Sequence, residues 1–167
     1  MLQKPLRKLK QYHAVAAVDR ETLAVGHWNG VGIDLINRGG RVLRHICSNV
    51  HPRFMDITDD GKLVCSTAYG AIARVQIDTG SVDFNESVLQ IEFPRGVATT
   101  FDGSILVTDG SSNMLHLVLS QDDSTKQLWS VPSDRDHGDP LRSASADGNV
   151  CVCVTVHGSV YILDCLY

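Results

Sequence analysis

The sequence is poor in several features that would identify its class at once. Lys and Arg total 15 against 19 Asp and Glu, which gives a net charge of −4, so the chain lacks the basic surface of nonspecific nucleic-acid binders. It has no apolar run of the roughly 18 residues that a transmembrane helix needs, and its first residues, Met1 to Pro5, lack the apolar core of a secretory signal. We therefore expect no membrane partner.

Cysteine is scarce and irregularly spaced. The five cysteines are an odd set with neither the spacing of a disulfide scaffold nor that of a zinc site. Cys151 and Cys153 share one face of a Val-rich strand, where small buried apolar side chains are the simplest interpretation. The pattern favours a reducing compartment, so we expect a cytoplasmic protein without a metal or cofactor.

Catalytic patterns are also missing. No Gly-x-Ser-x-Gly turn surrounds Ser111, Ser112 or Ser143, as serine hydrolysis in that class would require. No two histidines stand at metal-binding or catalytic spacing, so each is interpreted as a structural side chain. The seven histidines are His13, His27, His45, His51, His116, His137 and His157. We expect no catalytic residues and no metal ligands.

What the sequence does contain is a repeated β-meander. Residues 94–119 hold three short apolar runs, separated by a tight turn at Asp102-Gly103 and by a polar turn over 109–113. Asp-Gly between apolar runs is a strong hairpin signal, because Gly accepts the positive φ that the turn requires. Three such strands cannot bury both faces alone, so similar units should pack beside them.

Similar units are present. Residues 52–77 follow the same plan, with Asp60-Gly61 placed 42 residues before Asp102-Gly103. A third copy begins at Pro140, and a fourth, degenerate copy begins at His13. Copies that repeat about every 40–46 residues are typical of propeller blades, which have four strands each. The predicted fold is all-β, a β-propeller-like array of about four four-stranded antiparallel blades.

The repeat spacing also predicts the division of the chain, which forms one domain overall. The expected units are an outer strand of a preceding or closing blade at 1–12, blades at 13–51, 52–93 and 94–139, and a three-stranded blade at 140–167. The fourth strand of the second blade is expected at 86–92. Two interpretations stay open: a fragment of a six-bladed ring, or a small closed ring of four blades.

The copy at 94 resembles a known family. The stretch PRGVATTFDGSILVTDGSSN is similar to the NHL repeat, with Pro94, Gly96, Val97, Ala98, Asp102, Gly103, Asp109 and Asn113 at the shared positions. Residues 13–167 as a whole resemble the C-terminal propeller of tripartite-motif-like proteins of invertebrates. The resemblance implies a noncatalytic recognition module that binds protein or RNA. No zinc-ligand series accompanies it, so ubiquitin-ligase chemistry is not implied.

Alternation along the strands predicts the inner core. Its expected members are Val15, Ala17, Leu23, Val25, Ile57, Val64, Val97, Leu106, Leu115, Leu117, Val152, Val154 and Ile162.

The candidate binding residues are cationic. Arg53 and Arg95 occupy the same repeat position, directly after the Pro that enters the innermost strand, and His13 and Arg142 fall at or near it in the other copies. Two interpretations are open: solvated loop side chains, or a rim that binds an acidic or phosphorylated protein partner. RNA is the alternative ligand.

An enzymatic alternative is a metal-dependent propeller lactonase or lyase. Such a site would need acidic ligands from several inner strands, and Asp56 is the acid that the predicted inner strands offer.

Overall fold

The computed structural model describes residues 12–27, 31–46, 49–85, 91–119, 125–130, 141–147, 150–155 and 160–164; of these, 84–85, 125, 129–130, 141–147, 150–155 and 164 are described by their backbone alone. The described residues form strands and turns. Among them there is no helix that could cross a membrane.

The described strands form four antiparallel sheets, and in each sheet the strands lie in chain order. The first sheet contains β1 (Tyr12–Ala17), β2 (Thr22–His27), β3 (Ile33–Asn37) and β4 (Val42–Ile46). The second contains β5 (Pro52–Ile57), β6 (Lys62–Thr67), β7 (Ile72–Gln76) and β8 (Val82–Asn85). The third contains β9 (Pro94–Thr99), β10 (Ile105–Asp109), β11 (Met114–Val118) and β12 (Thr125–Ser130). The fourth contains β13 (Leu141–Asp147), β14 (Val150–Thr155) and β15 (Val160–Asp164).

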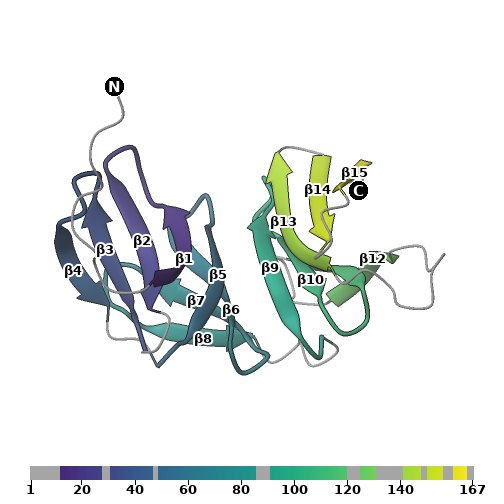
Figure 1. Ribbon diagram of the computed structural model, residues 1–167, viewed down its shortest axis with the longest axis horizontal. Helices are drawn as coiled ribbons and strands as arrows, with labels where there is room; N and C mark the ends of the chain where they lie inside the picture. The colour runs from purple at the N-terminus through teal and green to yellow at the C-terminus, as the bar shows by residue number, and fades with distance from the viewer. Residues whose placement is uncertain are drawn as a thin grey trace.

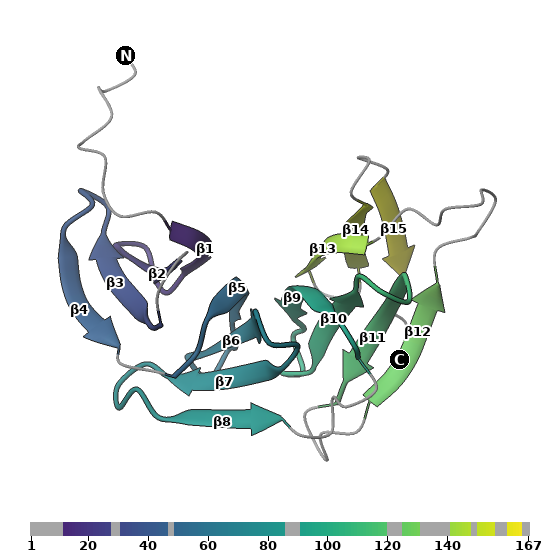
Figure 2. The ribbon, with the colours of Figure 1, turned by 60° about the horizontal axis from the view of Figure 1, so that its bottom comes forward.

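The four sheets, called blades 1 to 4 below, follow an arc. Figure 1 shows them side by side along the chain, and Figure 2 shows that β1, β5, β9 and β13 line the inside of the arc. The outer strands β4, β8 and β12 lie on its convex side, and blades 1 and 4 occupy its two ends. The molecule is therefore a partial β-propeller, as the repeats predicted.

The predicted Asp-Gly hairpins join the first two strands of blades 2 and 3. Gly61 and Gly103 have φ of 79° and 80°, a conformation that costs Gly little and other residues much. In both turns the Gly N–H donates to the carbonyl of the Thr three residues earlier, Thr58 or Thr100, at 2.9 Å. Because the two turns contain the same hydrogen bond, the first two strands of blade 2 and of blade 3 leave their turns in the same register.

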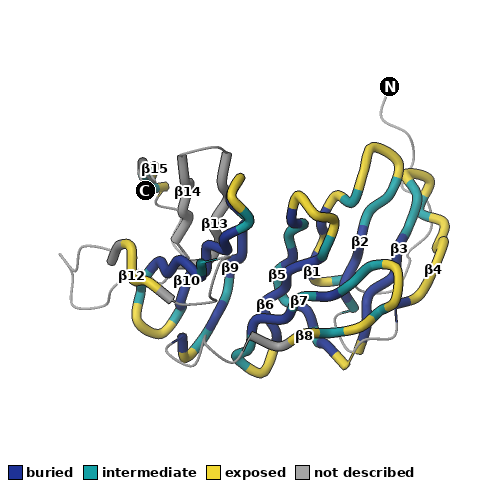
Figure 3. Tube along the Cα trace, turned by 180° about the vertical axis from the view of Figure 1, so that it is seen from behind, coloured by how far each residue is buried: buried dark blue, intermediate teal, exposed yellow. Residues whose placement is uncertain are grey.

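The core lies between the blades. One cluster joins blade 1 to blade 2 through side chains such as Ala16, Leu35 and Leu63, and another joins blade 2 to blade 3 through Val64 and Ile105. Figure 3 shows the buried segments gathered in the inner and middle strands, whereas β4 is largely exposed. The predicted core residues that prove to be buried are Val25, Val64, Val97, Leu106, Leu115 and Leu117.

Part of the predicted core is wrong. Val15 and Ile162 are 60% and 71% exposed, and Ala17 is exposed as well. In β1 the buried residues are Ala14 and Ala16, which pack toward blade 2. Apolar residues occupy both faces of this strand, so alternation cannot show which face meets the neighbouring blade. Leu23 and Ile57 are half-buried, and the side chains of Val152 and Val154 lie outside the described set.

The fourth strand of blade 2 begins earlier than predicted. It was expected at 86–92, of which 86–90 lie outside the described residues, whereas β8 is Val82–Asn85 and pairs with β7 through Val75 and Val82. The turn between them is short, since Gly80 N–H donates to the Gln76 carbonyl at 2.8 Å and Gln76 N–H donates to the Ser81 carbonyl at 2.9 Å. The strands β7 and β8 therefore pair directly after this short turn. The outer strand expected at 1–12 lies almost wholly outside the described residues, as do His137 and His157.

Candidate functional site

The four candidate rim residues share an unusual backbone position. In blade 1, Tyr12 pairs with His27 and Ala14 with Gly26, so His13 is an extra residue in β1. In blade 2, Pro52 pairs with Thr67 and Phe54 with Ser66, so Arg53 is extra in β5. Both residues are at β-bulges, which bend a strand and redirect a side chain.

Blades 3 and 4 repeat this arrangement. In β9 the pairs Pro94–Asp109 and Val97–Val107 leave Arg95 and Gly96 opposite a single residue. In β13 the pairs Leu141–Thr155 and Ser143–Val154 leave the backbone of Arg142 without a partner. Each candidate residue therefore lies at an irregularity near the start of an inner strand, and blade 4 follows the same rule as the others.

The structure brings two of the candidates onto one aromatic ring. The guanidinium carbons of Arg53 and Arg95 each lie 5.2 Å from the centre of the Phe93 ring, within the range of a cation–π contact. Phe93 was not among the predicted site residues. A signal existed, because an aromatic residue followed by Pro-Arg occurs twice, as 51–53 and 93–95.

Phe93 is held by the turn that follows β10. Its N–H donates to Asp109 Oδ1 at 3.1 Å, and Gly110 N–H donates to its carbonyl at 3.0 Å. Asp109 also accepts hydrogen bonds from Ser111 and Ser112. Burial alone would raise the pKa of Asp109, but these hydrogen bonds outweigh it and lower the pKa below its usual value. The carboxylate therefore stays ionised and keeps Phe93 in place.

Gly110 leaves room for the Arg95 side chain. A Cβ at Gly110 would lie 2.3 Å from Arg95 Nε and 2.7 Å from Arg95 Cδ, well inside van der Waals contact. Arg95 Nε is buried and has no hydrogen-bond partner among the described residues. In the part of the chain that the structure describes, neither Arg53 nor Arg95 forms an ion pair with a carboxylate. We call Arg53, Phe93 and Arg95 the arginine site.

For the remaining two candidates, the described residues establish an equivalent backbone position. His13 is exposed, and its ring lies 6.4 Å from that of Phe54. The backbone of Arg142 lies at the blade 4 bulge, and its side chain is outside the described set. The expected convergence of cationic side chains is thus present for Arg53 and Arg95.

A second cluster was not anticipated. His27 and His45, which the sequence spacing treated as separate structural side chains, both lie against the carboxylate of Asp34. Tyr12 donates its phenolic hydrogen to the same carboxylate at 2.9 Å. Burial followed by the contact with Asp34 raises the pKa of Tyr12 to about 12, while hydrogen bonds from His45 and Tyr12, together with the nearby His27 imidazole, overcome burial and lower the pKa of Asp34.

Comparison by sequence identifies no relative: no family model matches the chain, and no curated protein matches it. Comparison by structure finds proteins of similar fold. A catalytically inactive virginiamycin B lyase from Staphylococcus aureus, with quinupristin, matches with a TM-score of 0.65 and 13% identity, covering 92% of this chain and 55% of that one. The WD40 β-propeller domain of Doa1 matches with a TM-score of 0.68 and 17% identity, covering 90% and 50%.

The computationally designed protein Ika4 matches over 98% of this chain and 99% of its own, with a TM-score of 0.62 and 15% identity. The chain spans about half the length of the lyase structures. At these identities the likeness shows the fold alone, a β-propeller, and it covers enzymes and non-enzymatic modules alike.

Proposed function

We propose that the chain is a noncatalytic recognition module that binds an acidic or phosphorylated segment of a protein partner at the arginine site. One observation carries the proposal. Equivalent bulges of neighbouring blades bring two guanidinium groups to the same Phe93 ring, and among the described residues no carboxylate neutralises either of them.

The arrangement favours an anionic ligand. Two like charges held near one ring repel each other, so their proximity does not stabilise the fold. An anion placed between them removes that repulsion and accepts hydrogen bonds from both planar groups, a geometry that suits carboxylates and phosphates. Each such charge-assisted bond contributes about 1.5–3 kcal/mol.

Charge and composition favour a protein over a nucleic acid. The chain has a net charge of −4, so its long-range field repels a polyanion, whereas two localised cations can still hold one acidic or phosphorylated side chain. The resemblance to NHL repeats and the WD40 neighbour are compatible with a recognition module.

The test compares two double variants with equal charge. Arg53→Ala with Arg95→Ala removes the arginine site, and Arg20→Ala with Arg41→Ala removes two exposed arginines from blade 1 turns. Each protein, confirmed folded by circular dichroism, is used in pulldowns from RNase-treated and untreated lysate. The recovered partner is identified by mass spectrometry, and its acidic segment is titrated as a peptide with and without phosphate.

We expect the arginine-site variant to bind that peptide at least about tenfold more weakly and the control variant to bind it like the wild type. Equal binding by both variants would refute the arginine site. Recovery that depends on intact RNA would replace the protein ligand by RNA.

A further inference from the structure

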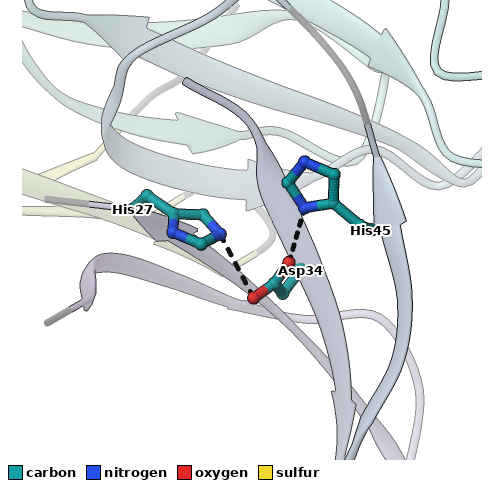
Figure 4. A group of neighbouring side chains, drawn as sticks. All are labelled: His27, Asp34 and His45. Carbon is teal, nitrogen blue, oxygen red and sulfur yellow. Dashed lines mark hydrogen bonds and ion pairs between the residues drawn. The ribbon is translucent and has the colours of Figure 1, made fainter. Parts of the chain in front are cut away.

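The cluster of His27, Asp34 and His45 is assembled across three strands of blade 1. Asp34 in β3 pairs with Val25 in β2 on one side and with His45 in β4 on the other. His27 lies two residues beyond Val25, so its side chain is on the same face. Figure 4 shows both imidazole rings directed at the Asp34 carboxylate, one from each neighbouring strand.

The ligand atoms of these residues lie close together. His45 Nδ1 is 2.7 Å from Asp34 Oδ1, and His27 Nε2 is 3.1 Å from Asp34 Oδ2. One nitrogen from each imidazole and a carboxylate oxygen all lie within 4.8 Å of one another. The two rings meet edge to face, with 5.6 Å between their centres.

The three side chains differ in exposure in a way that suits an ion entering from solvent. The side chains of Asp34, His27 and His45 are 1%, 13% and 44% exposed. His27 Nε2 is buried, and although it lies near Asp34 Oδ2 it is not aligned to form a hydrogen bond. A buried polar nitrogen without an aligned partner is costly, and a ligated cation would remove that cost.

We propose that blade 1 binds one Zn²⁺ through His27 Nε2, His45 Nδ1 and the Asp34 carboxylate. Neutral imidazoles and a carboxylate are ordinary zinc ligands, at about 2.0–2.2 Å from the ion. The same donor set disfavours Ca²⁺ and Mg²⁺, which require oxygen ligands. Three protein ligands leave one tetrahedral position for water.

Only a modest movement separates the present geometry from a zinc complex. Ligand atoms around tetrahedral zinc lie roughly 3.3 Å apart, so the widest separation, at most 4.8 Å, must shorten. His45 can supply this movement because it lies on the exposed strand β4. Tyr12 donates to Asp34 Oδ2 and so orients the carboxylate, the role that residues behind a ligand commonly have.

The test measures zinc binding by the whole chain, purified without a polyhistidine tag. Equilibrium dialysis with elemental analysis gives stoichiometry and affinity, and Co²⁺ in place of Zn²⁺ reports coordination through its visible absorption. The variants are His27→Gln, Asp34→Asn, His45→Gln and Tyr12→Phe. The control is His51→Gln, since His51 contacts Tyr69 instead of the cluster.

We expect one Zn²⁺ per wild-type chain and a tetrahedral Co²⁺ spectrum. Affinity should fall at least about tenfold in the ligand variants and in Tyr12→Phe, and it should not change in His51→Gln. His45→Gln decides the matter if a buried variant does not fold, because His45 is partly exposed. Absence of saturable binding, or equal binding by wild type and His45→Gln, would overturn the site and leave a purely hydrogen-bonded cluster. A ligand variant whose thermal midpoint lies below that of the wild type by the same amount with and without zinc would also overturn the site.

Discussion

The carboxylate of Asp56 in β5 binds Thr99 in β9 and so links blade 2 to blade 3. Asp56 Oδ2 accepts the Thr99 N–H at 2.7 Å and lies 3.1 Å from the Thr99 hydroxyl, which is also 2.8 Å from the Ile57 carbonyl. Asp56 is the acid on which the enzymatic alternative depended. Its hydrogen bonds between the blades support a structural role for Asp56.

Replacing Asp56 by Ala should weaken the contact between these blades. We expect the free energy of unfolding to fall by about 1.5–3 kcal/mol, because the Thr99 N–H loses a charged acceptor. Urea denaturation of the wild type, Asp56→Ala, Thr99→Val and the double variant gives the coupling energy. Asp59→Ala, in the exposed turn next to β5, serves as the control. Additive effects of the two single substitutions would show that the Thr99 hydroxyl does not contribute to the link, and equal free energies of unfolding for Asp56→Ala and Asp59→Ala would contradict the link itself.

The fold could be predicted because its signals are local. Asp-Gly turns and alternating apolar residues act within one hairpin, and their repetition fixed the blades. The buried face of each strand was harder to predict, since β1 is apolar on both sides although Val15 is exposed. The bulges were invisible for a similar reason: a bulge is a mismatch between two strands and has no signature in one strand alone.

The site could be predicted only in part. Repeat equivalence placed Arg53 and Arg95 together, because rotation relates equivalent positions of neighbouring blades. It could not show that Phe93 receives both side chains, which depends on the Asp109 turn. Nor could spacing reveal the cluster of His27, Asp34 and His45, because these side chains come together through strand pairing and not through a motif.

Gly110→Ala should disable the arginine site without unfolding the protein. The added Cβ would occupy the position of the Arg95 side chain near Nε and Cδ, so Arg95 must leave Phe93. We expect peptide binding to weaken to the level of Arg95→Ala, with a circular dichroism spectrum like that of the wild type. Gly39→Ala is a matched control, because a Cβ there would meet only Asn37 Oδ1, at 3.4 Å. Unchanged binding by Gly110→Ala would show that Arg95 does not need this position.

A pair of Asp substitutions tests which faces are buried. Leu106 is fully buried and Val15 is 60% exposed. Leu106→Asp places an unpaired charge in the core and should cost several kcal/mol, enough to unfold a domain of ordinary stability. Val15→Asp should change the free energy of unfolding by no more than about 0.5 kcal/mol. Thermal denaturation followed by circular dichroism compares the two, and a large loss in Val15→Asp would show that the outer face of β1 is covered.

The pH dependence of stability should carry a contribution from His116. Burial lowers the pKa of this imidazole below 6.5, and the charge of Asp109 offsets only part of the effect. Above pH 6.5 the side chain is neutral in both states and contributes nothing. As the pH falls below 6.5, the unfolded chain takes up a proton that the folded protein does not, so the free energy of unfolding decreases until the lower, folded-state pKa is reached.

His116→Gln should remove this contribution, so its free energy of unfolding should decrease less than that of the wild type just below pH 6.5. Urea denaturation at a series of pH values gives both curves, and His51→Gln provides the control. The stability that ionised Asp109 contributes is lost in a separate, more acidic pH range. Its pKa in the folded protein is lowered from 3.8, and the folded-state carboxylate protonates only as the pH falls through that lower value. Parallel curves for wild type and His116→Gln below pH 6.5 would show that burial does not hold His116 neutral.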